Sequence, residues 1–240
     1  MRPATSARDP RVVRAARLLR DADARREEGA FVVDEPALLE EALDAGIDVE
    51  WVLGEWDGGG RAGGAPEVAA ASADALRAVA AVGQPPSVVA ICRIPPAPPP
   101  ALPPRSLVLA HVADDGNVGS IVRTAAAFGL PRVALTPGCA DPWSRRALRA
   151  ARGATFRRGL VAEGARLEGG RLFAAVPRGG VDPRELPEDA CVVLGSERDG
   201  LRDDEREACV GAVSIPAPHF ESLNVAAAAA ILTYALARGA

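Results

Sequence analysis

The sequence predicts an α/β protein with a mostly parallel sheet, built in two parts. Short apolar runs such as 106–112 and 190–194 alternate with segments of helical periodicity, and strands that alternate with helices favour parallel pairing. Seven of the ten residues in 95–104 are proline, a composition that prefers extended geometry and stays out of sheet interiors. We therefore predict a small α/β domain over residues 1–94, a Pro-rich linker over 95–104 and a larger domain over 105–240.

The first part has the element spacing of a small α/β module. Small and aliphatic side chains recur along one side of 11–28, which predicts an amphipathic helix. Pro36 and Gly46 bracket a second helix, and Ser72 is placed to cap a third. The expected strands are 31–33, 49–53 and 87–94, the expected helices are 11–28, 37–45 and 72–82, and a Gly-rich loop is expected at 57–66.

The second part begins with the apolar run 106–112, which is typical of a buried parallel strand. A turn is expected at 115–119. Asp141 followed by Pro142 has the pattern of a helix N-cap and first helical residue. The remaining strands are expected at 132–136, 172–176, 190–194 and 213–215, and the helices at 120–128, 141–152, 201–209 and 223–237.

Composition restricts the class of protein. The chain has 240 residues, of which 48% are hydrophobic, enough for a sizeable core. No apolar run reaches the length of a membrane span and no charged-then-apolar leader is present, so we expect a cytoplasmic protein. The four cysteines form no CxxC pair, which argues against a zinc site and a disulfide framework. A net charge of −4 argues against general polyanion coating but leaves room for a local basic face.

Two turns and the start of the last helix are the expected ligand-binding places. The turns 114–123 and 194–201 follow buried strands, and α/β proteins bind ligands beyond the carboxyl ends of their strands. Glycines in both turns permit close backbone approach, although neither has the spacing of a nicotinamide fingerprint. Ser222 and Asn224 stand where the last helix starts, and either can cap its free N–H groups.

Taken together, these segments resemble a known family. Their residues are Asn117-x-Gly119-x-x-x-Arg123-Thr124, then Leu194-Gly195-Ser196-Glu197-x-x-Gly200-Leu201, then Ile215-Pro216 with Ser222-Leu223-Asn224-Val225. In order, rough spacing and context they resemble the three motifs of the SpoU (TrmH) branch of the SPOUT RNA methyltransferases, over about residues 106–240. The first part, with the run Phe31-Val32-Val33-Asp34, resembles the small substrate-binding domain of many rRNA-modifying members.

The resemblance implies a fold and an activity that composition alone does not show. It implies a C-terminal trefoil knot, S-adenosyl-L-methionine as the cofactor, and 2′-O-methylation of a ribose in RNA. It also implies a homodimer with the active site at the subunit interface. The expected substrate is 23S rRNA. The alternatives are a tRNA 2′-O-methyltransferase and a non-catalytic RNA-binding or ribosome-assembly protein on the same fold.

The resemblance also implies residue roles. Arg123 matches the catalytic arginine, and because a guanidinium is nearly always charged, we expect it to bind a phosphate and stabilise charge as the hydroxyl loses its proton. The other catalytic positions are Asn117, Glu197, Ser222 and Asn224. The cofactor-binding positions are Leu194, Gly195, Ser196, Gly200, Ile215, Pro216, Phe220 and Leu223.

The sequence departs from the family pattern at two places. Asp115 stands where the first motif has a proline, and the third-motif loop is one residue short, with His219 and Phe220 where a glycine is expected. We expect Phe220 to stack on or beside the cofactor. The pair His219 and Glu221 has no further ligand set, so we expect no metal site.

A basic cluster follows the first motif. Arg145, Arg149 and Arg152 stand at i, i+4 and i+7 of the expected helix 141–152 and so share one face. In an acidic protein that must hold RNA, we expect this face to bind phosphate, with an ordinary solvated helix face as the alternative. Further members of the cluster are Arg146, Arg157 and Arg158.

Overall fold

The computed structural model describes residues 3–4, 6–54, 67–80, 84–219 and 222–238. The chain divides into two compact units. The first comprises Met1–Pro96 with Trp143–Arg145, and the second comprises Ala97–Pro142 with Arg146–Ala240. The Gly-rich loop predicted over 57–66 lies outside the described residues.

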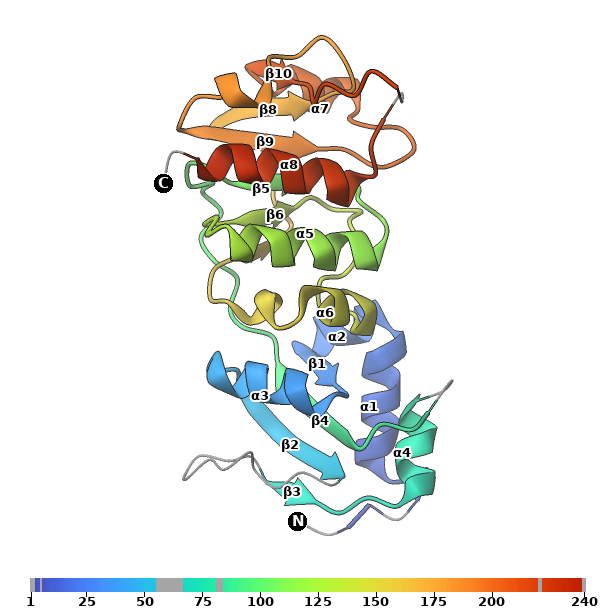
Figure 1. The fold of residues 1–240 in the computed structure, drawn as a ribbon. Helices are drawn as coiled ribbons and strands as arrows, with labels where there is room; N and C mark the ends of the chain where they lie inside the picture. The colour runs from blue at the N-terminus through green and yellow to red at the C-terminus, as the bar shows by residue number, and fades with distance from the viewer. Residues whose placement is uncertain (1–2, 5, 55–66, 81–83, 220–221, 239–240) are drawn as a thin grey trace. The chain divides into compact units, whose positions relative to one another are not determined.

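The first unit contains a mixed sheet. Its described strands are β1 (Ala30–Val33), β2 (Val49–Gly54), β3 (Val68–Ala69) and β4 (Val88–Arg93), in the order β1-β4-β2-β3 (Figure 1). Strand β4 runs antiparallel to β1 and to β2, whereas β2 and β3 are parallel. Two of the three described strand pairs in this unit are therefore antiparallel.

The helices of the first unit are α1 (Pro10–Arg20), α2 (Ala22–Glu28), α3 (Pro36–Asp44) and α4 (Ala73–Ala80). The single helix predicted over 11–28 is wrong, because Asp21 adopts an extended conformation and interrupts it. The Asp21 carboxylate accepts hydrogen bonds from the N–H groups of Asp23 and Ala24 at 2.9 and 3.2 Å, which starts a new helix. The predicted cap at Ser72 is confirmed by the N–H of Ala75, which donates to Oγ of Ser72.

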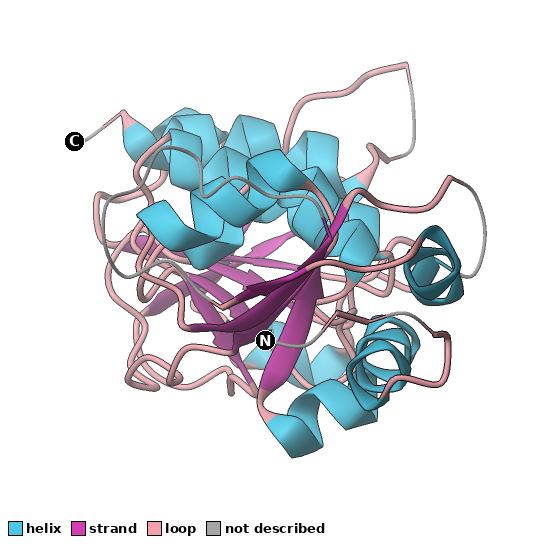
Figure 2. Cartoon of the chain, turned by 90° about the horizontal axis from the view of Figure 1, so that it is seen from below, coloured by secondary structure: helices cyan, strands magenta, loops and turns pink. Residues whose placement is uncertain are grey.

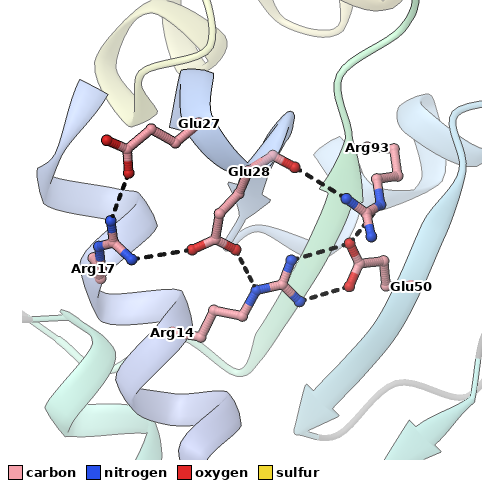
Figure 3. Close-up of polar contacts among 6 residues, drawn as sticks. All are labelled: Arg14, Arg17, Glu27, Glu28, Glu50 and Arg93. Carbon is pink, nitrogen blue, oxygen red and sulfur yellow. Dashed lines mark hydrogen bonds and ion pairs between the residues drawn. The ribbon is translucent and has the colours of Figure 1, made fainter. Parts of the chain in front are cut away.

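Carboxylates compensate the arginines of α1. Nε of Arg14 lies 2.6 Å from Glu28, and its Nη1 lies 2.6 Å from Glu50. The hydrogen bond from Arg14 holds the pKa of Glu50 below its ordinary value. The whole network comprises Arg14, Arg17, Glu27, Glu28, Glu50 and Arg93 (Figure 3). The network joins α1 and α2 to β2 and β4 within the first unit.

The second unit contains a parallel sheet. Its described strands are β5 (Leu107–Leu109), β6 (Val133–Leu135), β7 (Val161–Glu163), β8 (Arg171–Ala175), β9 (Ala190–Leu194) and β10 (Gly211–Val213). They follow the order β10-β8-β9-β5-β6-β7, and each neighbouring pair is parallel. The prediction of a mostly parallel sheet is confirmed here. The central strands β5 and β9 are fully buried, as their continuous apolar runs require.

The second unit also contains helices, which Figure 2 draws in cyan. They are α5 (Asp115–Ala127), α6 (Arg145–Ala151), α7 (Asp203–Glu207) and α8 (Val225–Ala237), with short 3₁₀ turns η1 (Ala154–Phe156) and η2 (Pro183–Glu185). Helices α5 and α8 lie side by side against the sheet (Figure 1). Their buried residues, including Ile121, Val122, Leu232 and Leu236, complete the core over the central strands.

Two helix starts differ from the prediction by four residues or more. The turn expected at 115–119 is the first turn of α5, because Asp114 caps the helix five residues earlier than expected. Conversely, α6 begins at Arg145 and not at Asp141. Trp143 is buried and its ring centroid lies 4.9 Å from that of Phe31, so tertiary packing overrides the local helix signal.

Candidate active site

A cavity of about 380 Å³ opens in the second unit beside the ends of β8, β9 and β10. Its apolar lining residues include Leu194, Val213, Ile215, Val225 and Leu232. Its polar lining residues include Ser196, Glu197, Arg198, Asp199, Arg206 and Ser222. A cavity lined by both kinds of side chain suits a small molecule that carries both kinds of surface.

The turn between β9 and α7 forms one wall and closes on itself. The N–H of Ser196 donates to the carbonyl of Gly200 at 3.1 Å, and the N–H of Gly200 donates back at the same distance. A Cβ atom at Gly195 would lie 2.2 Å from the carbonyl carbon of Gly200. Gly195 is therefore required by the tightness of the turn, and Gly200 by its positive φ of 66°.

The N-terminus of α5 meets this turn through Asn117. Oδ1 of Asp114 accepts from the N–H of Asn117 at 2.9 Å and so caps the helix. Nδ2 of Asn117 donates to Oε1 of Glu197 at 2.6 Å. Segments 80 residues apart in the chain are thus joined by a charge-assisted hydrogen bond.

The N-terminus of α8 reaches the same place. Oδ1 of Asn224 accepts from the N–H groups of Ala226 and Ala227 at 2.9 and 3.3 Å, which confirms Asn224 as the helix cap. Its Nδ2 lies 3.5 Å from Oδ1 of Asn117, at the long limit for a hydrogen bond. All three motif segments therefore converge on Asn117, while Ser222 is exposed at the cavity wall.

Arg123 stands apart from this convergence. It is exposed on α5, and within the described residues it has no ion pair. It lies six positions after Asn117, so the two side chains leave the helix about 120° apart. Arg123 does not line the cavity of its own chain.

Most, but not all, of the predicted cofactor-binding residues line the cavity. Leu194, Gly195, Ser196, Gly200, Ile215 and Leu223 line the cavity. Pro216 is exposed beside it and is not part of the lining, whereas its neighbour Ala217 is. Phe220, predicted to stack on the cofactor, lies outside the described residues.

The arginines predicted to form one basic face have different surroundings. Nη2 of Arg145 lies 2.6 Å from Asp34, whose side chain is only 2% exposed. Arg149 and Arg152 are exposed, and Arg152 has a positive φ of 50° just beyond the end of α6. Arg145 is thus committed to a buried carboxylate within the first unit.

The sequence did not reveal several cavity residues. Val213, Leu232 and Arg206 reach the site because β10, α8 and α7 meet there, which no local pattern signals. Burial raises the pKa of all four cysteine thiols, so none of them is an activated nucleophile. Among the described residues there is no group of three or more potential metal ligands. No described helix is long and apolar enough to cross a membrane.

Comparisons with known proteins identify relatives of this chain. Residues 104–234 match the sequence model of the SpoU rRNA Methylase family. The chain is 34% identical over 175 residues to the 23S rRNA (guanosine(2553)-2′-O)-methyltransferase RlmP of Bacillus subtilis, covering 69% of this chain and 70% of that protein. It is 37% identical over 139 residues to an uncharacterised tRNA/rRNA methyltransferase of Synechocystis, covering 53% of this chain. That match spans about half, 51%, of the Synechocystis protein.

The fold also resembles that of a solved structure. The AdoMet-bound rRNA methyltransferase from Sinorhizobium meliloti superposes with a TM-score of 0.84 at 24% identity, covering 99% of this chain and 97% of the other. At 24% identity, this similarity shows only that the two proteins share a fold.

Proposed function

Since the family model matches more than half of its length, the chain belongs to the SpoU rRNA Methylase family, and we propose that it is an S-adenosylmethionine-dependent RNA ribose 2′-O-methyltransferase. The observation that carries the proposal is the convergence of the three motif segments on Asn117, through the 2.6 Å hydrogen bond to Glu197 and the approach of Asn224. The proposed substrate is 23S rRNA, the substrate named for the relative from Bacillus subtilis.

The cavity fits the proposed cofactor. Leu194, Ile215 and Leu223 offer apolar surface to an adenine ring, and the tight glycine turn that Gly195 permits lines the same cavity. The polar lining residues suit the amino-acid end of the molecule. When bound, S-adenosylmethionine supplies an electrophilic methyl group on a positively charged sulfur.

The protein side chains supply positioning and charge. Asn117, Glu197 and Asn224 form a hydrogen-bonded group at the junction of the motifs, which can orient the ribose hydroxyls. Arg123 is a permanent cation, so its proposed role is to bind a neighbouring phosphate and to stabilise negative charge as the 2′-hydroxyl loses its proton. Ser222 lines the cavity, where its proposed role is to help orient the cofactor and the substrate.

A homodimer is part of the proposal, because Arg123 does not line the cavity of its own chain. Helices α5 and α8 expose large apolar side chains: Phe128 is 42%, Ile231 43% and Tyr234 54% exposed. The rings of Phe128 and Tyr234 stack edge-to-face at 5.8 Å. Covering this surface with a second copy would bury it and allow Arg123 to complete a site shared between subunits.

The finer topology and the domain roles are also proposed. After β10 at the sheet edge, the chain returns to α8, which packs against α5 and β9 in the middle (Figure 1). Such a return is compatible with the trefoil knot of the family. Residues 1–94 are proposed to be an RNA substrate-binding domain, joined by the linker 95–104 to the methyltransferase domain 105–240.

A labelled-methyl assay tests the proposal. The purified protein is incubated with labelled S-adenosylmethionine and either a 23S rRNA transcript or total tRNA, and 2′-O-methyl positions are mapped. We expect labelling of rRNA, lost in Arg123→Ala while calorimetric cofactor binding persists. Labelling confined to tRNA would favour the tRNA alternative. RNA binding without cofactor binding or transfer would favour the non-catalytic alternative.

A further inference from the structure

Arg146 is held beside the junction of the three motifs. Its Nη2 lies 2.9 Å from Oδ2 of Asp114, and its side chain is 67% exposed. The other oxygen of the same carboxylate, Oδ1, accepts from the N–H of Asn117 at 2.9 Å. One aspartate therefore joins the guanidinium of Arg146 to the helix end that carries Asn117.

The guanidinium of Arg146 also lies close to the backbone of Gly116. A Cβ atom at this position would lie 3.4 Å from both Nε and Nη2 of Arg146, and 3.0 Å from Oδ1 of Asp114. These are close contact distances, so the guanidinium of Arg146 lies against the first turn of α5. The orientation of Arg146 is thus set by a carboxylate on one side and by bare backbone on another.

The ion pair between Arg146 and Asp114 adds little to folding stability. An exposed ion pair contributes only about 0–1 kcal/mol to stability. A guanidinium has five N–H donors, and the pair with Asp114 engages one nitrogen. A cation already held in one orientation loses less conformational entropy when it binds an anion. The geometry therefore favours anion recognition over structural support.

We propose that Arg146 binds a phosphate of the substrate RNA next to the target ribose, with Asp114 holding its guanidinium in position. The inference rests on the proposed function, because it requires RNA as the substrate. It also revises which arginines at the start of α6 contact RNA. Arg145 is committed to the buried Asp34, whereas Arg146 keeps donors exposed beside Asn117.

The test compares RNA affinity over a salt series for matched variants. Arg146→Ala should weaken binding of a 23S rRNA transcript about 10-fold and reduce the slope of log affinity against log salt by about 0.7–0.9. The control is Arg184→Ala. Arg184 is also exposed, at 72%, and lies 2.7 Å from Asp182, an aspartate that caps η2. The Arg184→Ala variant should have the RNA affinity and the salt slope of the wild type.

A second variant tests the role of Asp114. Asparagine caps helices as well as aspartate does, so Asp114→Asn should keep α5 intact while releasing Arg146. We expect about 3-fold weaker RNA binding in the wild-type background and no further loss in Arg146→Ala. Calorimetric S-adenosylmethionine binding should not change in any of these variants.

The outcomes separate the inference from the proposed function. If the wild type methylates RNA but Arg146→Ala keeps its affinity and salt slope, the inference is overturned and the function stands. The inference is also overturned if Arg146→Ala loses no more RNA affinity than Arg184→Ala does. If the wild type neither binds nor methylates RNA, both are overturned.

Discussion

Replacing Gly119 with alanine should destabilise the second unit, although alanine is the better helix former. Gly119 is buried in α5, where a Cβ atom would lie 2.2 Å from the carbonyl oxygen of Ala147 and 2.8 Å from Cβ of Ala150. Intrinsic helix propensity favours the alanine by about 0.8–1 kcal/mol. The clash is with backbone of α6, so no side-chain rotation relieves it and the two helices must move apart.

The balance of these terms gives the expected magnitude. Overpacking a close contact costs about 1–3 kcal/mol and occasionally more. The 2.2 Å contact with a backbone oxygen places Gly119→Ala at or above the upper end of that range. After subtracting the gain in helix propensity, we expect a net loss of about 2 kcal/mol in unfolding free energy.

Urea unfolding followed by circular dichroism measures this loss. Gly119→Ala should lower the transition midpoint without a large change in slope. Ser120→Ala, at the next position of α5, is the control, because it improves helix propensity while removing an atom. It should stay within about 0.5 kcal/mol of wild type. A Gly119→Ala variant as stable as the wild type would refute the close packing of α5 against α6.

Three further predictions concern other parts of the molecule. The hydrogen bond from Arg14 lowers the pKa of Glu50, so the pair stabilises the first unit above the ordinary value of 4.5 and loses this effect as pH falls through the lower, folded pKa. The unfolding free energy of wild type minus that of Glu50→Gln should therefore shrink from neutral pH toward pH ~3, and a pH-independent difference would contradict this. Gly195→Ala should remove calorimetric cofactor binding, because its Cβ would collide with the turn at Gly200; unchanged affinity would exclude the turn from the site. Ile231→Glu should convert the proposed dimer to a monomer in light scattering, since it places a charge on the exposed apolar face.

The sequence predicted the elements that are marked by an apolar run of several residues next to a turn residue. Strand β9 occupies the predicted residues 190–194 because its five apolar residues end at a glycine turn. The strands β3 and β7 were not predicted, since two or three residues show no periodicity. The start of α6 was misplaced because Trp143 packs against Phe31, a contact between residues more than a hundred positions apart.

For the candidate site too, the sequence predicted the motif residues but not their contacts. The three motif segments are recognisable as sequence, and Asn117, Glu197 and Asn224 do meet. Their hydrogen-bond partners could not be assigned, because the register between α5, α8 and the glycine turn depends on the packing of the sheet. The pair of Asp114 and Arg146 was also hidden, because it requires α6 to pack closely against α5.

The closed turn at Ser196 and Gly200 affects the thermodynamics of binding. Two reciprocal backbone hydrogen bonds, and a third from the N–H of Asp199 to Oγ of Ser196, fix its shape from within. A molecule entering the cavity therefore meets a wall that is already formed. It need not supply the ordering free energy that a loose loop would demand, about 1–2 kcal/mol for each residue fixed. This preorganisation leaves more of the interaction energy available as affinity.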